Sequence, residues 1–353
     1  MKPRLQIFLA LAYALGPAWC SLVSAQAPTF LSAEARRADF QAFCRFVAED
    51  YAYFDIKVTD WARVCQHYSP LAEKAHDKAT FVRVLERSIG ELYDPHAHLA
   101  INIVDSTRLL PSQADVMAVW SHGRALITDV RRRSAAERAG LRVGEEVVTI
   151  NDVPVEQAAA EFKPRFVMRT DTSAQDWALQ VALAGRRSVD KVNLEVKTSH
   201  GVRKVSYAPI FQAPAELLTY AAADGIGRIR INNSLGNQSL VGDFDLALDN
   251  LLDVRALIID LRDTPSGGNS SVARGLLGRL VTDVLPYQRH ELVGEYRSTG
   301  VRRVWMEYVV PRGNAFRGPI VVLVGRWTGS MGEGVAIALN ATREAPVLGR
   351  PWG

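Results

Sequence analysis

Ser330 stands where acyl-transfer chemistry needs a nucleophile. Residues 320–334 read IVVLVGRWTGSMGEG, a β-branched apolar run that ends in a Gly-rich turn carrying a single serine. The run predicts a buried strand, and residues 335–339 (VAIAL) predict a buried helix that opens after the turn. At a helix start the backbone N–H groups are unpaired and the dipole is positive. The N–H of Met331 can therefore face the same substrate atom as the hydroxyl.

Two other patterns compete for the same residues. Ser330-x-x-Glu333 fits a helix capping box, which involves no chemistry. The nucleophile elbow of α/β-hydrolases needs G-x-S-x-G and a histidine later in the chain. Here Thr328 takes the place of the first glycine and no histidine follows Ser330, which disfavours that class.

A second Gly-rich turn follows another buried strand. Residues 256–261 (ALIIDL) predict the strand, and residues 262–269 (RDTPSGGN) predict the turn. Its glycines allow two roles. They make a tight connection into a helix, or they let a backbone N–H approach a substrate closely.

Two histidines lie in a polar turn broken by proline, residues 91–99 (ELYDPHAHL). His96 and His98 are close enough in sequence to be considered as metal ligands. No cysteine lies nearby, and the support from carboxylates such as Asp94 and Asp105 is weak, so a metal site is disfavoured. A pair of surface histidines and a catalytic base are the remaining interpretations.

These three stretches resemble motifs of one enzyme family, the tail-specific or carboxyl-terminal-processing serine peptidases with the related tricorn core. Residues 328–333 (TGSMGE) resemble the nucleophile motif T-A-S-A-S-E. Residues 260–268 (DLRDTPSGG) resemble D-L-R-G-N-P-G-G, and residues 94–98 (DPHAH) resemble the D-x-H-[ST] turn of tricorn-type members. Asp263 and Met331 are among the departures from the family's residues.

The resemblance implies a serine peptidase with assigned roles. It makes Ser330 the nucleophile and His96 the general base. It also gives one oxyanion-hole N–H to Gly267, with Gly268 as the alternate, beside the N–H of Met331.

The identity of the base divides this family. Tail-specific members use a lysine downstream of the serine, after a G-x-P turn. No lysine follows Lys204, and the sequence stops at residues 347–353 (VLGRPWG). We therefore expect one of three cases. The chain is truncated before that lysine and the last strands of the core, or it uses a tricorn-type pair of Ser330 and His96 with His98 as a bystander, or it is inactive.

Residues 116–157 resemble a PDZ module of the kind that these peptidases carry ahead of their core. Residues 124–130 predict a strand, residues 134–140 a short helix, and residues 141–152 (LRVGEEVVTIND) a turn into another strand. A PDZ domain captures an extended peptide tail by strand addition. Residues 120–123 (WSHG) take the place of the usual carboxylate-binding phrase, so a rigid spacer or a gate is the alternative role.

The first residues predict a secretory signal. Lys2 and Arg4 precede the apolar residues 5–15, and the sequence VSA before Gln26 fits cleavage after Ala25. The apolar stretch is shorter than the roughly 20 residues of a membrane span. We expect an exported protein, periplasmic or secreted, without a stable membrane span in its mature form.

Composition narrows the class of protein further. The 353 residues carry 42 Lys+Arg and 38 Asp+Glu, and the net charge of +4 is spread rather than clustered, so nucleic acid is not implied as a partner. Cys44 and Cys65 remain after signal cleavage, either as a disulfide or as two buried thiols.

We expect an α/β multidomain protein. Its predicted parts are a signal peptide (1–25), a helical domain (26–110), a PDZ-like β domain with an insertion (111–207) and an incomplete α/β catalytic core of the Clp/crotonase type (208–353). The expected function is an exported serine endopeptidase that cleaves peptides or unfolded proteins, including protein C-terminal tails, through an acyl-enzyme and without metal or organic cofactor. The alternatives are a catalytically silent PDZ-containing scaffold and a ligand-binding protein on the same core.

Overall fold

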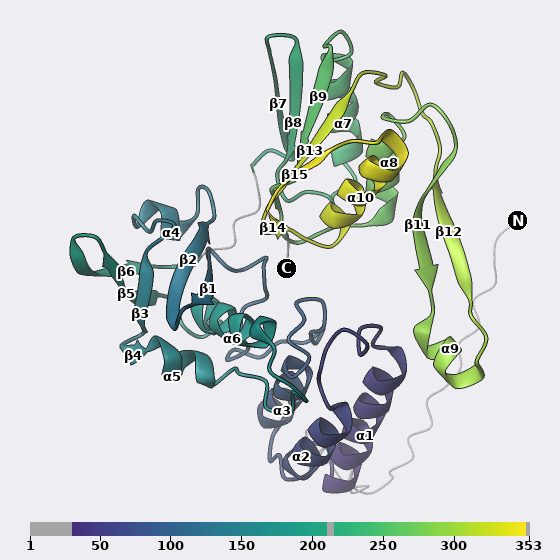
Figure 1. Ribbon diagram of the computed structural model, residues 1–353. Coiled ribbons are helices and arrows are strands. Elements are labelled where there is room, and N and C mark those ends of the chain that lie inside the picture. Colours follow the sequence, from purple (N-terminus) through teal and green to yellow (C-terminus); the bar gives the residue numbers. More distant parts are fainter. Residues whose placement is uncertain (1–29, 210–214, 351–353) are drawn as a thin grey trace, which may run out of the picture.

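The computed structural model describes residues 30–209 and 215–350. The predicted signal peptide lies outside the described residues. Figure 1 shows a helical group, a small β-sheet with its own helices and a larger α/β unit, in this order along the chain. Each part has its own cluster of buried apolar side chains.

The helical group confirms the helices predicted from the sequence. Its helices are α1 (Ala33–Asp50), α2 (Trp61–Glu73) and α3 (Lys78–Gly90). Each one begins after a residue whose side-chain oxygen accepts a hydrogen bond from a first-turn N–H, and these caps are Ser32, Asp60 and Asp77. Phe40, Val64 and Tyr68 lie in the buried centre of the group.

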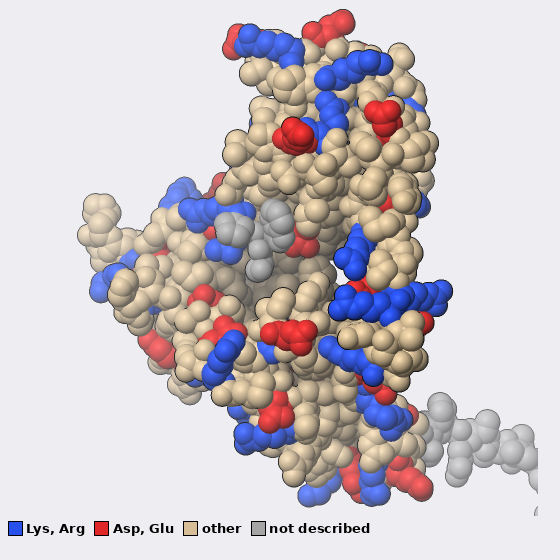
Figure 2. Space-filling model, turned by 45° about the vertical axis from the view of Figure 1, so that its right-hand side comes forward, with Lys and Arg blue, Asp and Glu red and all other residues tan. Residues whose placement is uncertain are grey.

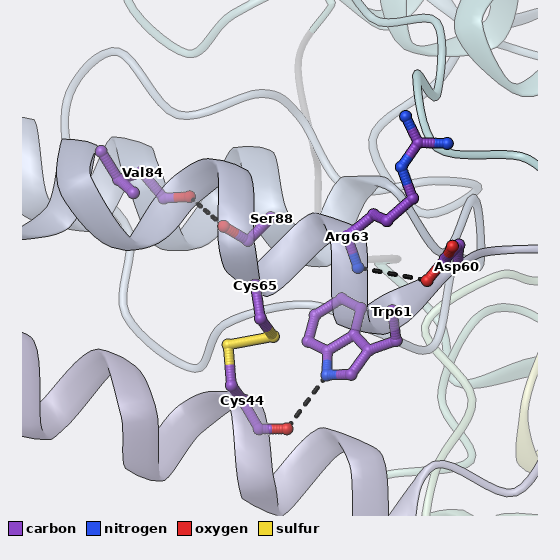
Figure 3. The surroundings of a disulfide bond; sticks show 7 residues. All are labelled: Cys44, Asp60, Trp61, Arg63, Cys65, Val84 and Ser88. Atoms are coloured by element: carbon purple, nitrogen blue, oxygen red, sulfur yellow. Dashed lines mark hydrogen bonds between the residues drawn. A yellow bond between two sulfur atoms is a disulfide. The ribbon is translucent and has the colours of Figure 1, made fainter.

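A disulfide joins α1 to α2 (Figure 3). The Cα atoms of Cys44 and Cys65 lie 6.1 Å apart, within the range that a disulfide bridges. The indole N–H of Trp61 donates to the carbonyl of Cys44 at 3.0 Å, so the two helices also share a hydrogen bond beside the disulfide. Of the two states that the sequence allows for these cysteines, the structure has the disulfide.

The small sheet is antiparallel, in the order β1-β2-β3-β5-β6 with β4 beside β3. Its strands are β1 (Val116–Ser121), β2 (Arg124–Val130), β3 (Glu146–Ile150), β4 (Val153–Pro154), β5 (Val192–Thr198) and β6 (Gly201–Tyr207). Its helices are α4 (Ala135–Arg138), α5 (Val155–Ala160) and α6 (Thr172–Ala184). The predicted strand at 124–130 is β2, and the predicted short helix is α4, capped by Ser134.

The α/β unit contains a five-stranded sheet in the order β15-β13-β9-β8-β7, parallel except between β7 and β8. Its strands are β7 (Leu218–Ala223), β8 (Ile226–Ile231), β9 (Ala256–Asp260), β13 (Ile320–Val324) and β15 (Val347–Gly349). Its helices are α7 (Leu240–Asp249), α8 (Ser270–Leu277) and α10 (Met331–Arg343). Because β9 and β13 are parallel neighbours, the two Gly-rich turns that follow them meet at the same edge of the sheet.

A long hairpin reaches from the α/β unit to the helical group. Its strands β11 (Leu285–Glu291) and β12 (Val304–Val309) carry α9 (Val293–Thr299) at their tip, beside α1 (Figure 1). The guanidinium of Arg297 donates to three carbonyls at the end of α1, those of Ala48, Glu49 and Tyr51. This contact docks two parts of the chain that are far apart in sequence.

Charged side chains of both signs are interspersed over the face shown in Figure 2. This distribution agrees with the near balance of 42 basic and 38 acidic residues in the sequence. Over the described ranges, no helix has both the length and the apolar character that crossing a membrane requires.

Candidate active site

Ser330 lies in a strained turn beyond the central strand β13. The short strand β14 (Trp327–Thr328) precedes it, and α10 begins directly after it. Ser330 has φ 52° and ψ −114°, a conformation that residues with a side chain rarely adopt. Such strain costs about 1–3 kcal/mol. The serine is exposed, and its hydroxyl accepts no capping hydrogen bond from α10. The capping-box interpretation is therefore wrong for this hydroxyl, which is accessible to a substrate.

The serine turn is joined to the second Gly-rich turn by a short parallel pair. The strand β10 (Asp263–Thr264) lies beside β14 in register. The buried hydroxyls of Thr264 and Thr328 donate to the same carbonyl, that of Leu261, at 2.9 and 2.8 Å. Buried hydroxyls are costly to leave unpaired, so these two bonds fix one turn against the other.

Gly267 lies directly against Ser330. A Cβ atom added to Gly267 would lie 2.4 Å from the Cβ and 2.8 Å from the Oγ of Ser330, and 3.2 Å from the nitrogen of Met331. The φ of Gly267, +64°, also favours glycine. The structure thus brings together the serine and the two residues that the sequence predicts for the oxyanion hole.

The N–H groups around Ser330 differ in their hydrogen bonds. The N–H of Gly267 donates to the carbonyl of Thr264 at 3.1 Å. Within residues 30–209 and 215–350, the N–H groups of Gly268 and Met331 have no acceptor. Of the two glycines, Gly268 is therefore the one whose N–H is unpaired among the described residues.

His96 lies in the turn after α3, on the helical group. The buried carboxylate of Asp94 accepts the backbone N–H of His96 at 2.8 Å through Oδ1, and that oxygen lies 3.8 Å from Nδ1 of the imidazole. The other oxygen of Asp94 accepts the hydroxyl of Tyr51 at 2.8 Å. At 3.8 Å the ring does not hydrogen-bond to this carboxylate, which lies on the side where such a bond would hold the proton on Nδ1 and leave Nε2 free to accept one. The sequence analysis named Asp94 as a nearby carboxylate and as the first residue of the D-x-H turn, but it did not predict that Asp94 holds this turn.

Buried side chains tie the His96 turn to a segment of the PDZ-like part. The carboxylate of Glu91 accepts the N–H groups of residues 165–166, and burial raises the pKa of Glu91. The hydroxyl of Tyr93 donates to Asp171 at 2.8 Å. These partners lie between α5 and α6, so the position of His96 depends on the PDZ-like part as well as on the helical group.

The charges of the His96 turn influence a carboxyl group at the start of α10. Burial raises the pKa of the Glu333 carboxyl, while the charge of His96 opposes this rise and that of Asp94 adds to it. Glu333 lies in the first turn of α10, next to Ser330 along the helix. The His96 turn therefore lies within electrostatic range of the helix start that follows Ser330. Among the described residues, no hydrogen bond joins His96 to Ser330.

Two aspartates of the second turn have structural roles that sequence reasoning missed. Asp260 is buried, and although burial opposes its ionisation, hydrogen bonds from Arg262 and Arg228 hold its pKa at about 2. Asp263 binds the guanidinium of Arg131, from the PDZ-like part, at 2.9 to 3.0 Å. Asp263 stands where the family has glycine, and a charged residue at such a position signals a partner elsewhere in the chain.

The other predicted histidine is not part of this arrangement. His98 is exposed, and its Nδ1 lies 3.1 Å from the carbonyl of Leu99. In the part of the chain that the structure describes, no group of three or more His, Cys, Asp and Glu side chains could hold a metal ion.

An exposed, strained serine beside the unpaired N–H of Met331 is an arrangement that serine-type peptidases use. Three family models match the sequence. Peptidase family S41 matches residues 225–353, the tricorn protease C1 domain matches residues 32–90, and a PDZ domain matches residues 126–162. The chain therefore is a serine-type peptidase that combines a family S41 core with a tricorn-type helical part and a PDZ match. The predicted family and the predicted fold class are confirmed.

Solved structures share this fold. The structure of mature CPAF complexed with lactacystin has a TM-score of 0.58 at 16% identity, over 89% of this chain and 84% of that chain. The photosystem II D1 C-terminal processing protease has a TM-score of 0.50 at 16% identity, over 89% of this chain and 80% of that chain. At these identities the likeness concerns the fold alone. No curated protein matches the sequence.

Proposed function

We propose that this serine peptidase is an exported endopeptidase that cleaves peptide bonds through an acyl-enzyme on Ser330. The observation that carries the proposal is the exposed hydroxyl held at positive φ against Gly267 and beside the unpaired N–H of Met331. A hydroxyl and oxyanion donors held in this way meet one substrate carbonyl with little reorganisation. Such preorganisation is the largest single contribution to many acyl transfers.

The chemistry proceeds in two halves. The Oγ of Ser330 bonds to the substrate carbonyl carbon while His96 accepts the hydroxyl proton, and the N–H groups of Met331 and Gly268 hold the oxyanion. His96 then gives the proton to the leaving amine as the peptide C–N bond breaks. Water attacks the ester in the same manner, with His96 as base, and releases the new carboxylic acid and free Ser330.

Asp94 is the group that we propose orients His96. Its carboxylate holds the turn through the backbone N–H and lies on the Nδ1 side of the ring. The hydrogen bond between the imidazole and the serine forms when substrate binds, as it does for many general bases. The exposed ring of His96 has room for the rotation that this requires.

We propose peptides and unfolded proteins as the substrate class, with protein C-terminal tails included. One structure of similar fold is named a C-terminal processing protease, and the PDZ match supports binding of an extended peptide. Export is proposed from the signal pattern of residues 1–25, and the Cys44–Cys65 disulfide supports it because disulfides persist in oxidising compartments. Mass spectrometry of the exported form should find Gln26 as its first residue.

A serine-directed fluorophosphonate tests the proposed nucleophile. The probe should label the protein at Ser330, and Ser330→Ala should abolish the labelling. Ser239→Ala is the matched control, because Ser239 is also an exposed serine before a helix but has an ordinary backbone, with φ −64° and ψ −20°. Lactacystin, present in the CPAF structure, is a second probe. Labelling that persists in folded Ser330→Ala protein would remove Ser330 from this role.

A further inference from the structure

One edge of the PDZ-like sheet, strand β1, is covered by a helix of the same chain. Strand β1 is the last strand of its sheet and has a strand neighbour, β2, on one side only. An extended peptide that binds a PDZ domain pairs with such an edge through its backbone N–H and C=O groups. In this structure α6 lies along β1 (Figure 1).

Two side chains of α6 form hydrogen bonds with the backbone groups of β1 that an added peptide strand would use. The carboxylate of Asp176 accepts the N–H of Trp120 at 2.8 Å, and the amide of Gln180 donates to the carbonyl of Ala118. Residues two apart on a strand point their backbone groups to the same side, and residues four apart on a helix share one face. The two spacings are similar, about 6 Å along the helix and about 7 Å along the strand.

The rest of this contact is apolar. Leu179, Ala182 and Leu183 of α6 belong to the same buried cluster as Val116 and Ala118 of β1. With α6 hydrogen-bonded to β1 and packed on it, no strand can pair with this edge in the conformation observed.

Two features make the contact costly to keep. The Oε1 atom of Gln180 is buried and, within the described ranges, has no hydrogen-bond partner. Burial raises the pKa of Asp176, against the opposing effects of the Trp120 N–H and the charge of Arg326. Both side chains regain water if α6 moves away, which lowers the net cost of opening.

We propose that α6 is an internal competitor for the peptide edge, so that β1 accepts an extended peptide only after Asp176 and Gln180 have left it. An incoming peptide supplies an N–H and a C=O in their place, and the backbone groups of Ala118 and Trp120 stay paired throughout the exchange. The inference concerns access to the PDZ-like part and does not depend on the chemistry at Ser330.

The contact also reaches the serine turn. Trp327 is buried with Met117 of β1 and with Ala184, the last residue of α6. Its indole N–H donates to the carbonyl of Ala114 at 2.8 Å. Trp327 belongs to β14, which leads into Ser330. A shift of α6 away from β1 therefore acts on one end of the turn that holds the nucleophile.

The experiment measures peptide binding by fluorescence anisotropy, in the Ser330→Ala background so that no probe is cleaved. The probes are fluorescein-labelled decapeptides that differ only in their last residue, with backbone N-methylated copies that cannot pair with a strand. The variant Asp176→Ala/Gln180→Ala removes the two contacts. The matched control is Glu156→Ala/Gln157→Ala, which removes an acid and an amide from the exposed face of the neighbouring helix α5.

We expect the Asp176→Ala/Gln180→Ala protein to bind at least one decapeptide about tenfold more tightly than the parent, with no binding of its N-methylated copy. The α5 control should bind like the parent. Equal binding by the parent and the folded double variant overturns the proposal, and so does a folded double variant that binds nothing. If the double variant does not fold, Asp176→Ala alone must show a smaller gain in the same direction, and no gain overturns the proposal as well.

Discussion

The two turns that hold the candidate catalytic residues are built in opposite ways. The turn of Ser330 is held mainly within the α/β unit, through a parallel strand pair, two buried threonine hydroxyls and a glycine with no room for a side chain, while Trp327 adds one contact with the PDZ-like part. The turn of His96 is held by side chains from elsewhere. Tyr51 comes from the end of α1, and Glu91 and Tyr93 bind the segment between α5 and α6.

This difference separates two requirements of the chemistry. The nucleophile and the oxyanion donors need fixed positions, because their contribution depends on preorganisation. The base has only to reach the serine when a substrate is bound. In this protein the first requirement is met mainly within the α/β unit, whereas the position of the base depends on how the helical and PDZ-like parts dock together. Variants of the two turns should therefore fail in different ways.

The largest effect is expected at the nucleophile. Ser330→Ala should lower kcat/KM by roughly 10⁴-fold or more, since the remaining groups supply little chemistry without it. Ser330→Gly should be equally inactive but should have a higher Tm than Ser330→Ala, because glycine adopts the positive φ with less strain. Peptide hydrolysis and thermal melts check both statements. Equal melting temperatures would show that the turn stores no strain.

The next effect is expected at the base. His96→Ala should lower kcat by about 10² to 10⁴-fold, the usual contribution of a positioned base, while the control His98→Ala should change it little. Activity of the unsubstituted protein should fall as pH drops through the imidazole range, near 6.5 in model peptides, because only the neutral ring accepts a proton. A rate that instead rises at high pH and is unchanged by His96→Ala and by His98→Ala would indicate a lysine base.

A smaller effect is expected from substitution of Asp94, the carboxylate that we propose orients His96. Asp94→Asn keeps an oxygen that can accept the N–H of His96, so the turn should persist while the charge is lost. We expect kcat to fall about tenfold, because the amide does not stabilise the imidazolium that forms during the reaction as the carboxylate does. The carboxylate of Glu333 is the other acidic group near the ring. If Glu333→Gln lowers kcat and Asp94→Asn does not, the orienting role belongs to Glu333.

The smallest effect is expected at the docking contact of the hairpin. Arg297→Ala removes the donor to three carbonyls at the end of α1 and should lower kcat/KM roughly threefold, through the position of the His96 turn. Labelling of Ser330 by the fluorophosphonate should still occur. Arg303→Ala is the control, since Arg303 lies on the same hairpin but is exposed and forms its salt bridge with Glu295 of the hairpin itself. Equal losses in the two variants would argue against a specific docking role.

Local sequence patterns were sufficient for the nucleophile side of the site. Two largely apolar runs, residues 256–261 and 320–324, predicted buried strands, and each was followed by a Gly-rich turn. Because the carboxyl ends of parallel neighbours meet, such turns come together once the strands pair. The contact of Gly267 with Ser330 then follows from the fold of a single sheet.

Only the tertiary structure decided how the surroundings of His96 are assembled. His96 is separated from Ser330 by more than half of the chain, and its neighbourhood depends on buried contacts of Glu91, Tyr93 and Asp94 whose partners no local pattern reveals. The same holds for the contact of α6 with β1, since a polar pair four residues apart on a helix is ordinary in sequence until a strand edge lies beside it. Helical and strand periodicities arise from neighbours along the chain, and the sequence therefore specifies them directly. Docking depends on surfaces that come to exist only after each part has folded.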